Sequence, residues 1–454
     1  MRLFLRVLKW LGIGVAGLIG LVVLAYGVLV VINWSDEPPS EAYLAFEASL
    51  DEIGPLDHPD NAYVYALGLG VPEDEDPVEF GRQWVEWSQL PLKEQLETEE
   101  PSGETLFGYD RSGRDSLLSA CRDFDEECAE FISSPRDTLS VVAAESQWIV
   151  TRYQQLLELP VWYEPPPDSI LSIPFYNDLM YSGVIYGHRA WQIAREGAHE
   201  QALDMLDQEA RFLRMVHEKA GILLTRMVVL NGLRNNLQWT NAILQMDGEG
   251  GRDVPEAWQK PISPSERSMS RAAAGELVVM DASYESRFYN IGEGTPFLTR
   301  LEWAIGALLL QNQANKNLMA DIYAQTNEVV VKPYPEIMAA ADSFREYKRE
   351  LEDNVSLGLK NPVGVILMKY GLQNDYTLYL GVRSTDLEGA RRVLILAQQL
   401  RAEGVTPEEV PARLQTADIR NPYTEEPFGW DAEAAEITFN GLAPGDRNEF
   451  SLKY

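Results

Sequence analysis

The chain has 454 residues, with 38 basic and 70 acidic side chains, a formal charge of −32 and 45% hydrophobic residues. This apolar share supports a large folded core, which excludes a mainly disordered chain, and two cysteines exclude a disulfide-dense miniprotein. The acidic excess excludes binding to a nucleic acid backbone, because phosphate binding needs clustered lysine and arginine side chains.

The first element in the chain is an uncharged segment of 25 residues from Trp10 to Trp34. A helix needs roughly 20 apolar residues to span a bilayer, and tryptophan is common at both interfaces. We therefore predict one transmembrane helix over 10–33. A cleaved signal peptide is the alternative, but its apolar region would be shorter and would end in small residues, whereas residues 28–32 read VLVVI.

The basic residues Arg2, Arg6 and Lys9 all precede this span, which predicts a cytoplasmic N-terminus and an inner-membrane location. Residues 1–34 are then the tail and anchor, and no acidic residue lies among them. The rest of the chain, with 35 basic and 70 acidic residues and a charge of −35, is expected in the periplasm.

Small residues recur every fourth position inside the predicted span, at Gly12, Ala16 and Gly20. Such a ladder lets two membrane helices approach closely, and it predicts self-association through this face. The alternative is that glycine is simply common in membrane helices.

Residues 35–40 (SDEPPS) predict a short polar linker, and 41–372 predict a helical periplasmic domain. Polar N-cap residues followed by proline predict several helix starts. Proline- and glycine-rich segments predict breaks, and the run 303–310 predicts a buried helical segment that is too short to span a membrane. The predicted starts are 76–79, 134–137, 263–266, 295–296 and 406–409, and the predicted breaks are 163–168, 248–253 and 332–335.

The two cysteines, Cys121 and Cys128, are expected to pair in an oxidising compartment. Seven residues of unbroken helix would hold their Cα atoms about 10 Å apart, so pairing predicts a helix break over 122–127. A redox or metal role is the alternative, although the C-x-x-C spacing is absent.

The last part of the chain, 373–454, predicts a small α+β module. A helix over 386–403 and a short one over 407–415 lead into a turn-rich segment, and two strands over 435–442 and 449–454 form a hairpin. The expected fold is therefore mainly α, with an N-terminal transmembrane helix and a C-terminal module ending in a β-hairpin.

Two segments carry a resemblance. The C-terminal module, with its two helices, the turn at Asn421-Pro422-Tyr423 and Pro427-Phe428 and the final hairpin, resembles a module of uncharacterised bacterial envelope proteins. This arrangement is also similar to the post-helix part of pseudopilins. Residues 60–82 (DNAYVYALGLGVPEDEDPVEFGR), the cysteine pair and the helical block 188–240 resemble uncharacterised single-pass periplasmic envelope proteins of Gram-negative bacteria. The resemblance implies anchoring in the inner membrane and implies no particular reaction.

Two glutamates are candidate acids for glycan hydrolysis, because a carboxyl group against an indole ring can act as a general acid. Glu86 lies between Trp84 and Trp87, and Glu302 precedes Trp303. In the alternative interpretation, helical spacing places Trp84 and Trp87 together on a face that packs inward.

The candidate metal ligands are His188, Glu196, His199 and His217. Glu196 and His199 form a single Glu-x-x-His, and a helix reversal near 197–201 would bring His188 toward His217. The alternative is four separate structural or surface residues. The acidic loop 73–76 is either a calcium loop or a solvated helix start, and no cofactor is expected.

Three function classes follow. The first is a membrane-anchored envelope protein that binds or scaffolds other envelope proteins. The second is a periplasmic hydrolase of cell-wall or glycan material, and the third is a ligand-binding or sensor domain. Two converging carboxylates in a cleft would favour the hydrolase, and a flat apolar patch would favour a protein partner.

Overall fold

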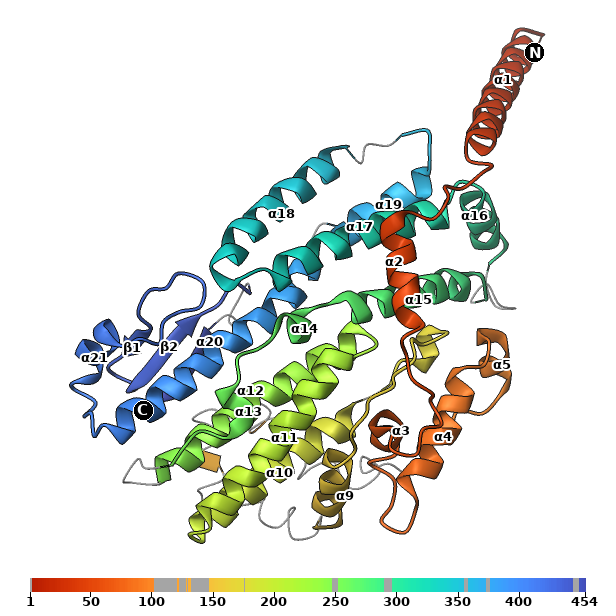
Figure 1. Cartoon of the computed structure of the whole chain (residues 1–454). Coiled ribbons are helices and arrows are strands. Elements are labelled where there is room, and N and C mark those ends of the chain that lie inside the picture. The colour runs from red at the N-terminus through yellow and green to blue at the C-terminus, as the bar shows by residue number, and fades with distance from the viewer. Residues whose placement is uncertain are drawn as a thin grey trace.

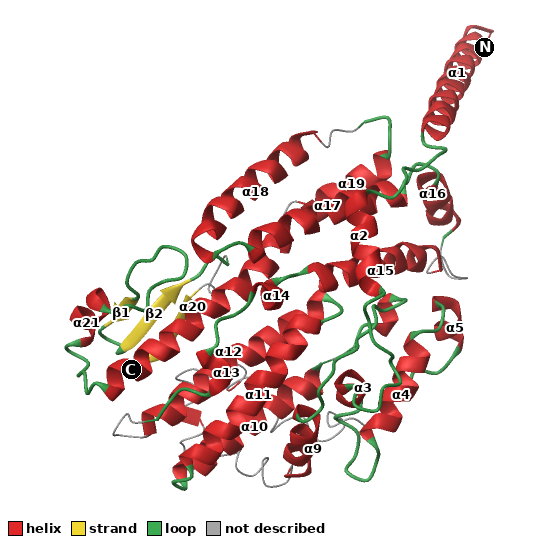
Figure 2. Cartoon of the chain, in the orientation of Figure 1, coloured by secondary structure: helices red, strands yellow, loops and turns green. Residues whose placement is uncertain are grey.

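The computed structural model describes residues 2–101, 121, 128, 130–131, 147–174, 176–246, 252–289, 296–354, 358–372, 376–443 and 449–454. The chain is 68% helical and 4% strand, which confirms the predicted mainly α class (Figure 2). The described elements are α1 (Arg2–Ile32), α2 (Glu41–Leu50), α3 (Ala62–Leu67), α4 (Pro77–Ser88), α5 (Leu92–Glu97), α9 (Gln147–Leu157), η2 (Ile170–Ser172), α10 (Asn177–Arg195), α11 (His199–Lys219), α12 (Leu223–Met246), α13 (Glu256–Gln259), α14 (Pro264–Arg267), α15 (Ser270–Tyr289), α16 (Phe297–Ala307), α17 (Asn312–Val331), α18 (Tyr334–Asn354), α19 (Pro362–Leu372), α20 (Tyr376–Ala402), α21 (Val410–Thr416), β1 (Gly429–Asp431), β2 (Glu436–Asn440) and β3 (Glu449–Lys453).

Helix α1 extends away from the folded body (Figure 1). Its segment Lys9–Ile32 has a mean hydropathy of 2.8, and none of it is buried in the protein. This confirms the prediction of one N-terminal helix long and apolar enough to span a membrane. Gly12, Ala16 and Gly20 are all exposed on α1, and no atom lies within 4 Å of a Cβ built on either glycine.

The linker 35–40 lies against the N-terminal end of α17. The Asp36 carboxylate accepts hydrogen bonds from the backbone N–H groups of Gln313, at 2.8 Å, and Ala314, at 3.1 Å. Asn317 bonds the linker backbone through both ends of its amide. A carboxylate at a helix N-terminus is favourable, so Asp36 caps α17 and attaches the segment that follows α1 to the body.

The body is built around three long helices, α10, α11 and α12, with α15, α17 and α20 packed beside them (Figure 1). Helices α10 and α11 form the expected hairpin, which reverses at Gly197 with a φ of +91°. That left-handed conformation carries little cost for glycine. The larger of two hydrophobic clusters among the described residues runs from Ala62 near the beginning of the body to Leu452 in the last strand, and the smaller one joins α2, α15 and α17.

Helix α20 begins at Tyr376, ten residues before the predicted start at 386. It contacts α12, α17 and the sheet, so nearly all of its surface is buried. A helix buried on all sides lacks a polar face, and its first half therefore shows no amphipathic pattern. The predicted domain boundary at 372–373 stays a prediction, although α20 packs against both parts.

The predicted helix starts differ in their outcome. Asp76 caps α4 by accepting from the N–H of Val78, and Ser263 forms a full capping box with Glu266. The start predicted at 406–409 is confirmed only in part: the Thr406 N–H donates a 3.0 Å hydrogen bond to Glu409 Oε2, as in a capping box, but 407–409 form a turn and α21 begins at Val410. The start predicted at 134–137 lies outside the described residues, as does most of the break at 248–253.

The three strands form one antiparallel sheet in the order β1-β2-β3. The predicted hairpin is confirmed as β2 and β3, with Ile437 opposite Leu452 and Phe439 opposite Phe450. These four side chains are buried against α20, while their neighbours along each strand are more exposed. The short strand β1, in a segment predicted as a turn, was missed.

A buried aspartate holds the C-terminal module on α20. Asp386 accepts hydrogen bonds from the Tyr423 hydroxyl, at 2.6 Å, and from the backbone N–H groups of Leu442, at 2.8 Å, and Ala443, at 3.1 Å. Both the turn before the sheet and the chain after β2 are therefore attached to one side chain.

Cys121 and Cys128 are both buried and lie at disulfide distance, with their Cα atoms 4.7 Å apart. The helix break predicted over 122–127 lies outside the described residues.

The run 303–310 was predicted as a buried helical segment, and this prediction is wrong. Helix α16 and the residues after it expose several large apolar side chains, among them Leu301, Ile305 and Leu308. The physical reason is its position, because α16 lies beside the end of α1 and outside the core (Figure 1).

Candidate functional site

A cavity of about 360 Å³ lies among α10, α11 and α12, and Tyr153 of α9 also lines it. Its volume is in the range of small-molecule sites. Its walls are largely apolar, and its polar groups are asparagine side chains of α10 and α12 together with one glutamate. The apolar wall includes Leu179, Met180, Val184, Leu213, Val228 and Val229.

Two glycines allow the three helices to leave this space. A Cβ on Gly183 of α10 would lie 3.3 Å from the Tyr153 hydroxyl and 3.4 Å from Glu209 Oε1. A Cβ on Gly232 of α12 would lie 3.1 Å from Leu213. Larger side chains at these positions would occupy the cavity and press on the groups that line it.

Glu209 of α11 is the buried carboxyl of the cavity, with 3% of its surface exposed. Its Oε1 accepts a 2.9 Å hydrogen bond from the Tyr153 hydroxyl, and its Oε2 accepts one of 2.8 Å from Asn236 Nδ2. Burial raises the pKa of Glu209 from 4.5 to about 7, although the two hydrogen bonds oppose the rise. The carboxyl therefore changes charge near neutral pH.

The two partners of Glu209 are themselves held in place. The Asn236 amide accepts a 2.8 Å hydrogen bond from Trp258 Nε1 and donates one of 2.9 Å to the Leu206 carbonyl, which sets its orientation. Burial and the nearby Glu209 carboxyl raise the pKa of Tyr153 well above 10, so its hydroxyl stays protonated and donates. The Tyr153 hydroxyl and the Asn236 amide therefore have fixed orientations, and they hold the Glu209 carboxylate in one position.

The cavity has an unbalanced charge. Among the described residues that line it, Glu209 is the one carboxyl, and none is a lysine, arginine or histidine. Asn177, Asn231, Asn235 and Asn236 add neutral donors and acceptors around it. An ionised Glu209 attracts a positively charged group, and the aromatic rings of Tyr153 and Trp239 can add cation–π contacts.

The candidate acids from the sequence lie elsewhere. Glu86 is exposed on α4 and Glu302 is exposed on α16, and the two helices are well apart in Figure 1. Trp84 and Trp87 are buried together, with ring centroids 5.2 Å apart, as the structural interpretation expects. Neither glutamate lines the cavity.

The structure does not bring the candidate metal ligands together. The Tyr186 hydroxyl of α10 donates a hydrogen bond to the Met205 carbonyl of α11, so these two residues lie at about the same height in the α10–α11 hairpin. His217 lies twelve residues beyond Met205, a rise of roughly 18 Å, so the reversal at Gly197 does not place His188 beside it. Within the described part of the chain, no group of three or more histidine, cysteine, aspartate or glutamate residues could hold a metal ion.

Each of these four residues has a different setting. His188 is buried and stacks on Trp191, whereas Glu196 is exposed and His199 is half-buried at the α10–α11 turn. His217 is buried, with Nε2 3.1 Å from the Ser384 hydroxyl oxygen. Burial, together with two nearby arginines, lowers the pKa of His217 well below 6.5, which keeps it neutral.

The acidic loop 73–76 is a solvated helix start. Its side chains are exposed, and the guanidinium of Arg152 donates to the carbonyls of Pro72, at 2.7 Å, and Glu73, at 3.1 Å. A cation already occupies the backbone oxygens that a calcium ion would need.

The sequence contains a pattern that identifies Glu209 as a candidate site residue. Ala202, Leu206, Leu213 and Val216 form the apolar stripe of α11, and Glu209 lies on that stripe at helical spacing. A carboxyl in an apolar stripe is rarely buried without a specific partner, so it marks a candidate site.

Comparisons with models of protein families, with curated proteins and with solved structures give no match for this chain.

Proposed function

We propose that the protein is a membrane-anchored binding protein of the bacterial envelope, and that its cavity takes a small organic amine. The observation that carries the proposal is the buried Glu209 carboxyl in a cavity whose described lining has no basic side chain. A protonated amine would pair with the carboxylate, and the apolar wall would take the rest of the ligand.

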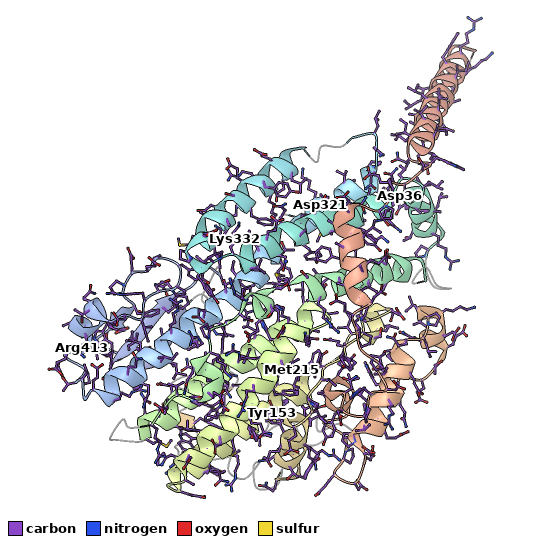
Figure 3. All side chains as sticks on the ribbon, in the orientation of Figure 1. Asp36, Tyr153, Met215, Asp321, Lys332 and Arg413 are labelled. Carbon is purple, nitrogen blue, oxygen red and sulfur yellow. A yellow bond between two sulfur atoms is a disulfide. The ribbon has the colours of Figure 1, made fainter. Side chains whose placement is uncertain are left out.

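The proposed location is the inner membrane, with α1 as an uncleaved anchor, the N-terminus in the cytoplasm and the body in the periplasm. The basic residues Arg2, Arg6 and Lys9 support this orientation. The cysteine pair at disulfide distance supports an oxidising compartment. The cavity residue Tyr153 lies well apart from Asp36 at the end of the anchor (Figure 3), so an amine would enter from the aqueous phase.

An envelope partner completes the proposal. The exposed face of Gly12, Ala16 and Gly20 supports contact through the membrane helix, with a second copy or another envelope protein.

Glycan hydrolysis is less well supported. That reaction needs a second carboxyl roughly 5–10 Å from the first, and Glu209 stands alone among the described lining residues.

The test is calorimetric titration of the full chain in detergent micelles with 2-phenylethylamine, using the neutral 2-phenylethanol as the matched ligand. We expect the amine to bind more tightly than the alcohol. We also expect its affinity to fall about tenfold for each pH unit below 7, because binding must then remove the proton from Glu209.

Two variants make the test specific. Glu209→Gln is expected to weaken amine binding at least about tenfold, or 1.4 kcal/mol, while the exposed control Glu86→Gln leaves it unchanged. Equal affinity for amine and alcohol, or amine binding that survives Glu209→Gln, would contradict the proposal.

A further inference from the structure

Helix α16 carries an apolar face that the body does not cover. Leu298, Leu301, Ile305 and Leu308 are spaced at three and four residues, which places them on one stripe about 80° wide. All four are exposed, and Leu298 has 70% of its surface exposed. A continuous exposed apolar stripe on a surface helix indicates a contact with a lipid or a protein.

Direct contact with α1 sets the position of this helix. The Tyr26 hydroxyl of α1 donates a 2.8 Å hydrogen bond to the Ile305 carbonyl of α16. Tyr26 lies eight residues before Trp34, which is roughly 12 Å along a helix. If Trp34 marks the outer interface of the bilayer, Ile305 lies at the depth of the last two turns of the membrane helix.

A second contact places the residues before α19 at the same level. Asn33, at the end of α1, donates to the Leu359 carbonyl at 2.8 Å and accepts from the Asn361 N–H at 2.6 Å. Leu359 is exposed, as is Ile366 on α19. Exposed apolar side chains thus surround the point where α1 leaves the body.

We infer that α16 is an interfacial membrane helix, with its stripe of Leu298, Leu301, Ile305 and Leu308 in the outer leaflet of the bilayer that α1 spans. This inference depends on the proposed anchor. The continuity with α1 selects lipid over a protein partner, because any surface at the depth of Tyr26 meets acyl chains.

The charged residues of α16 agree with this placement. Arg300 points away from the stripe, roughly 120° from its centre, and Glu302 lies on its flank at roughly 80°. Both side chains are exposed. A helix in the interface keeps such groups toward the headgroups and water, and an arginine there can reach a lipid phosphate.

The experiment measures depth in the full chain, reconstituted in vesicles of phosphatidylethanolamine and phosphatidylglycerol. Nitroxide labels are placed singly through Leu298→Cys, Leu301→Cys and Ile305→Cys. Val22→Cys reports on α1, and Met338→Cys is the control, because Met338 is an exposed apolar residue on α18, away from the anchor. Each label is scored by its collision rates with oxygen and with a water-soluble nickel chelate.

We expect the three α16 labels to show an oxygen-to-nickel ratio several-fold higher than the Met338 label, and similar to the Val22 label. A lipid-like Val22 label with water-like α16 labels would overturn the interfacial helix and leave the anchor standing. Water-like signals at both would overturn the anchor and the inference together. If the α16 labels are shielded from both reagents and their spectra are broadened by a second nitroxide nearby, a second copy of the chain covers α16 in place of lipid.

Discussion

Replacing Glu209 with glutamine tests the electrostatics of the cavity through the stability of the fold. Folded Glu209 holds its proton up to about pH 7, whereas in the unfolded chain a glutamate loses its proton near the ordinary value of 4.5. Between these values the folded state binds more protons, so the contribution of Glu209 to stability falls as the pH rises. Glutamine cannot ionise and does not show this loss.

The size of the effect follows from the two pKa values. The difference between 4.5 and about 7, at about 1.36 kcal/mol for each pKa unit, gives a full loss of about 3 kcal/mol, most of which is reached by pH 8. Most of this loss, about 2 to 3 kcal/mol, falls between pH 5 and pH 8. We therefore expect Glu209→Gln to gain about 2 to 3 kcal/mol of stability relative to the wild type over this interval.

The assay is urea unfolding of the full chain in detergent micelles, followed by tryptophan fluorescence at pH 5 and pH 8. Comparing the variant with the wild type at each pH cancels the titration of other groups that both proteins share. Glu86→Gln is the matched control, since Glu86 is exposed, and it is expected to follow the wild type. A difference between wild type and Glu209→Gln that is the same at both pH values would refute the reasoning.

Three further predictions concern single contacts. Gly187→Ala places a Cβ 2.5 Å from Trp239 Nε1. We expect the free energy of unfolding to fall by about 1–3 kcal/mol, measured as a lower urea midpoint. An unchanged midpoint would show that the indole ring moves freely. Asp36→Ala removes the carboxylate that caps α17. We expect the free energy of unfolding to fall by about 1 kcal/mol and proteolysis of the linker 35–40 to become faster. An unchanged rate of cleavage would contradict the attachment of the linker to α17. Asp386→Ala leaves the backbone N–H groups of Leu442 and Ala443 without their acceptor and leaves the Tyr423 hydroxyl with Thr385 alone. We therefore expect the free energy of unfolding to fall by about 3 kcal/mol and hydrogen exchange over 421–443 to become faster. Slow exchange over this range would contradict the role of Asp386 in holding the module.

Features that depend on nearby residues were predictable. The apolar segment of α1, the caps at Asp76 and Ser263 and the β2–β3 hairpin each arise from a short stretch of sequence. Burial of whole helices was not predictable, because it depends on what packs around them. Helix α20 buries charged side chains such as Asp386 and Glu388, whereas α16 exposes Leu298 and Ile305, so side-chain polarity alone does not predict which of the two helices is buried.

The candidate site was predictable only in part. A single helix shows that Glu209 interrupts an apolar stripe, and this much can be read from the sequence. Its partners cannot, because Tyr153 and Asn236 lie 56 and 27 residues away and reach it through the packing of α9 and α12. The orientation of Asn236 depends in turn on Trp258.

The attachment of the linker to α17 has a mechanical consequence. A flexible tether would let the body rotate freely around the axis of α1. Here Asp36 and Asn317 hold the linker along α17, and Tyr26 and Asn33 hold α1 to the body. Rotation of α1 about its own axis therefore turns the body by the same angle. Torque applied to α1 is transmitted to the body, and two copies joined through their α1 helices would present their bodies in one fixed mutual orientation.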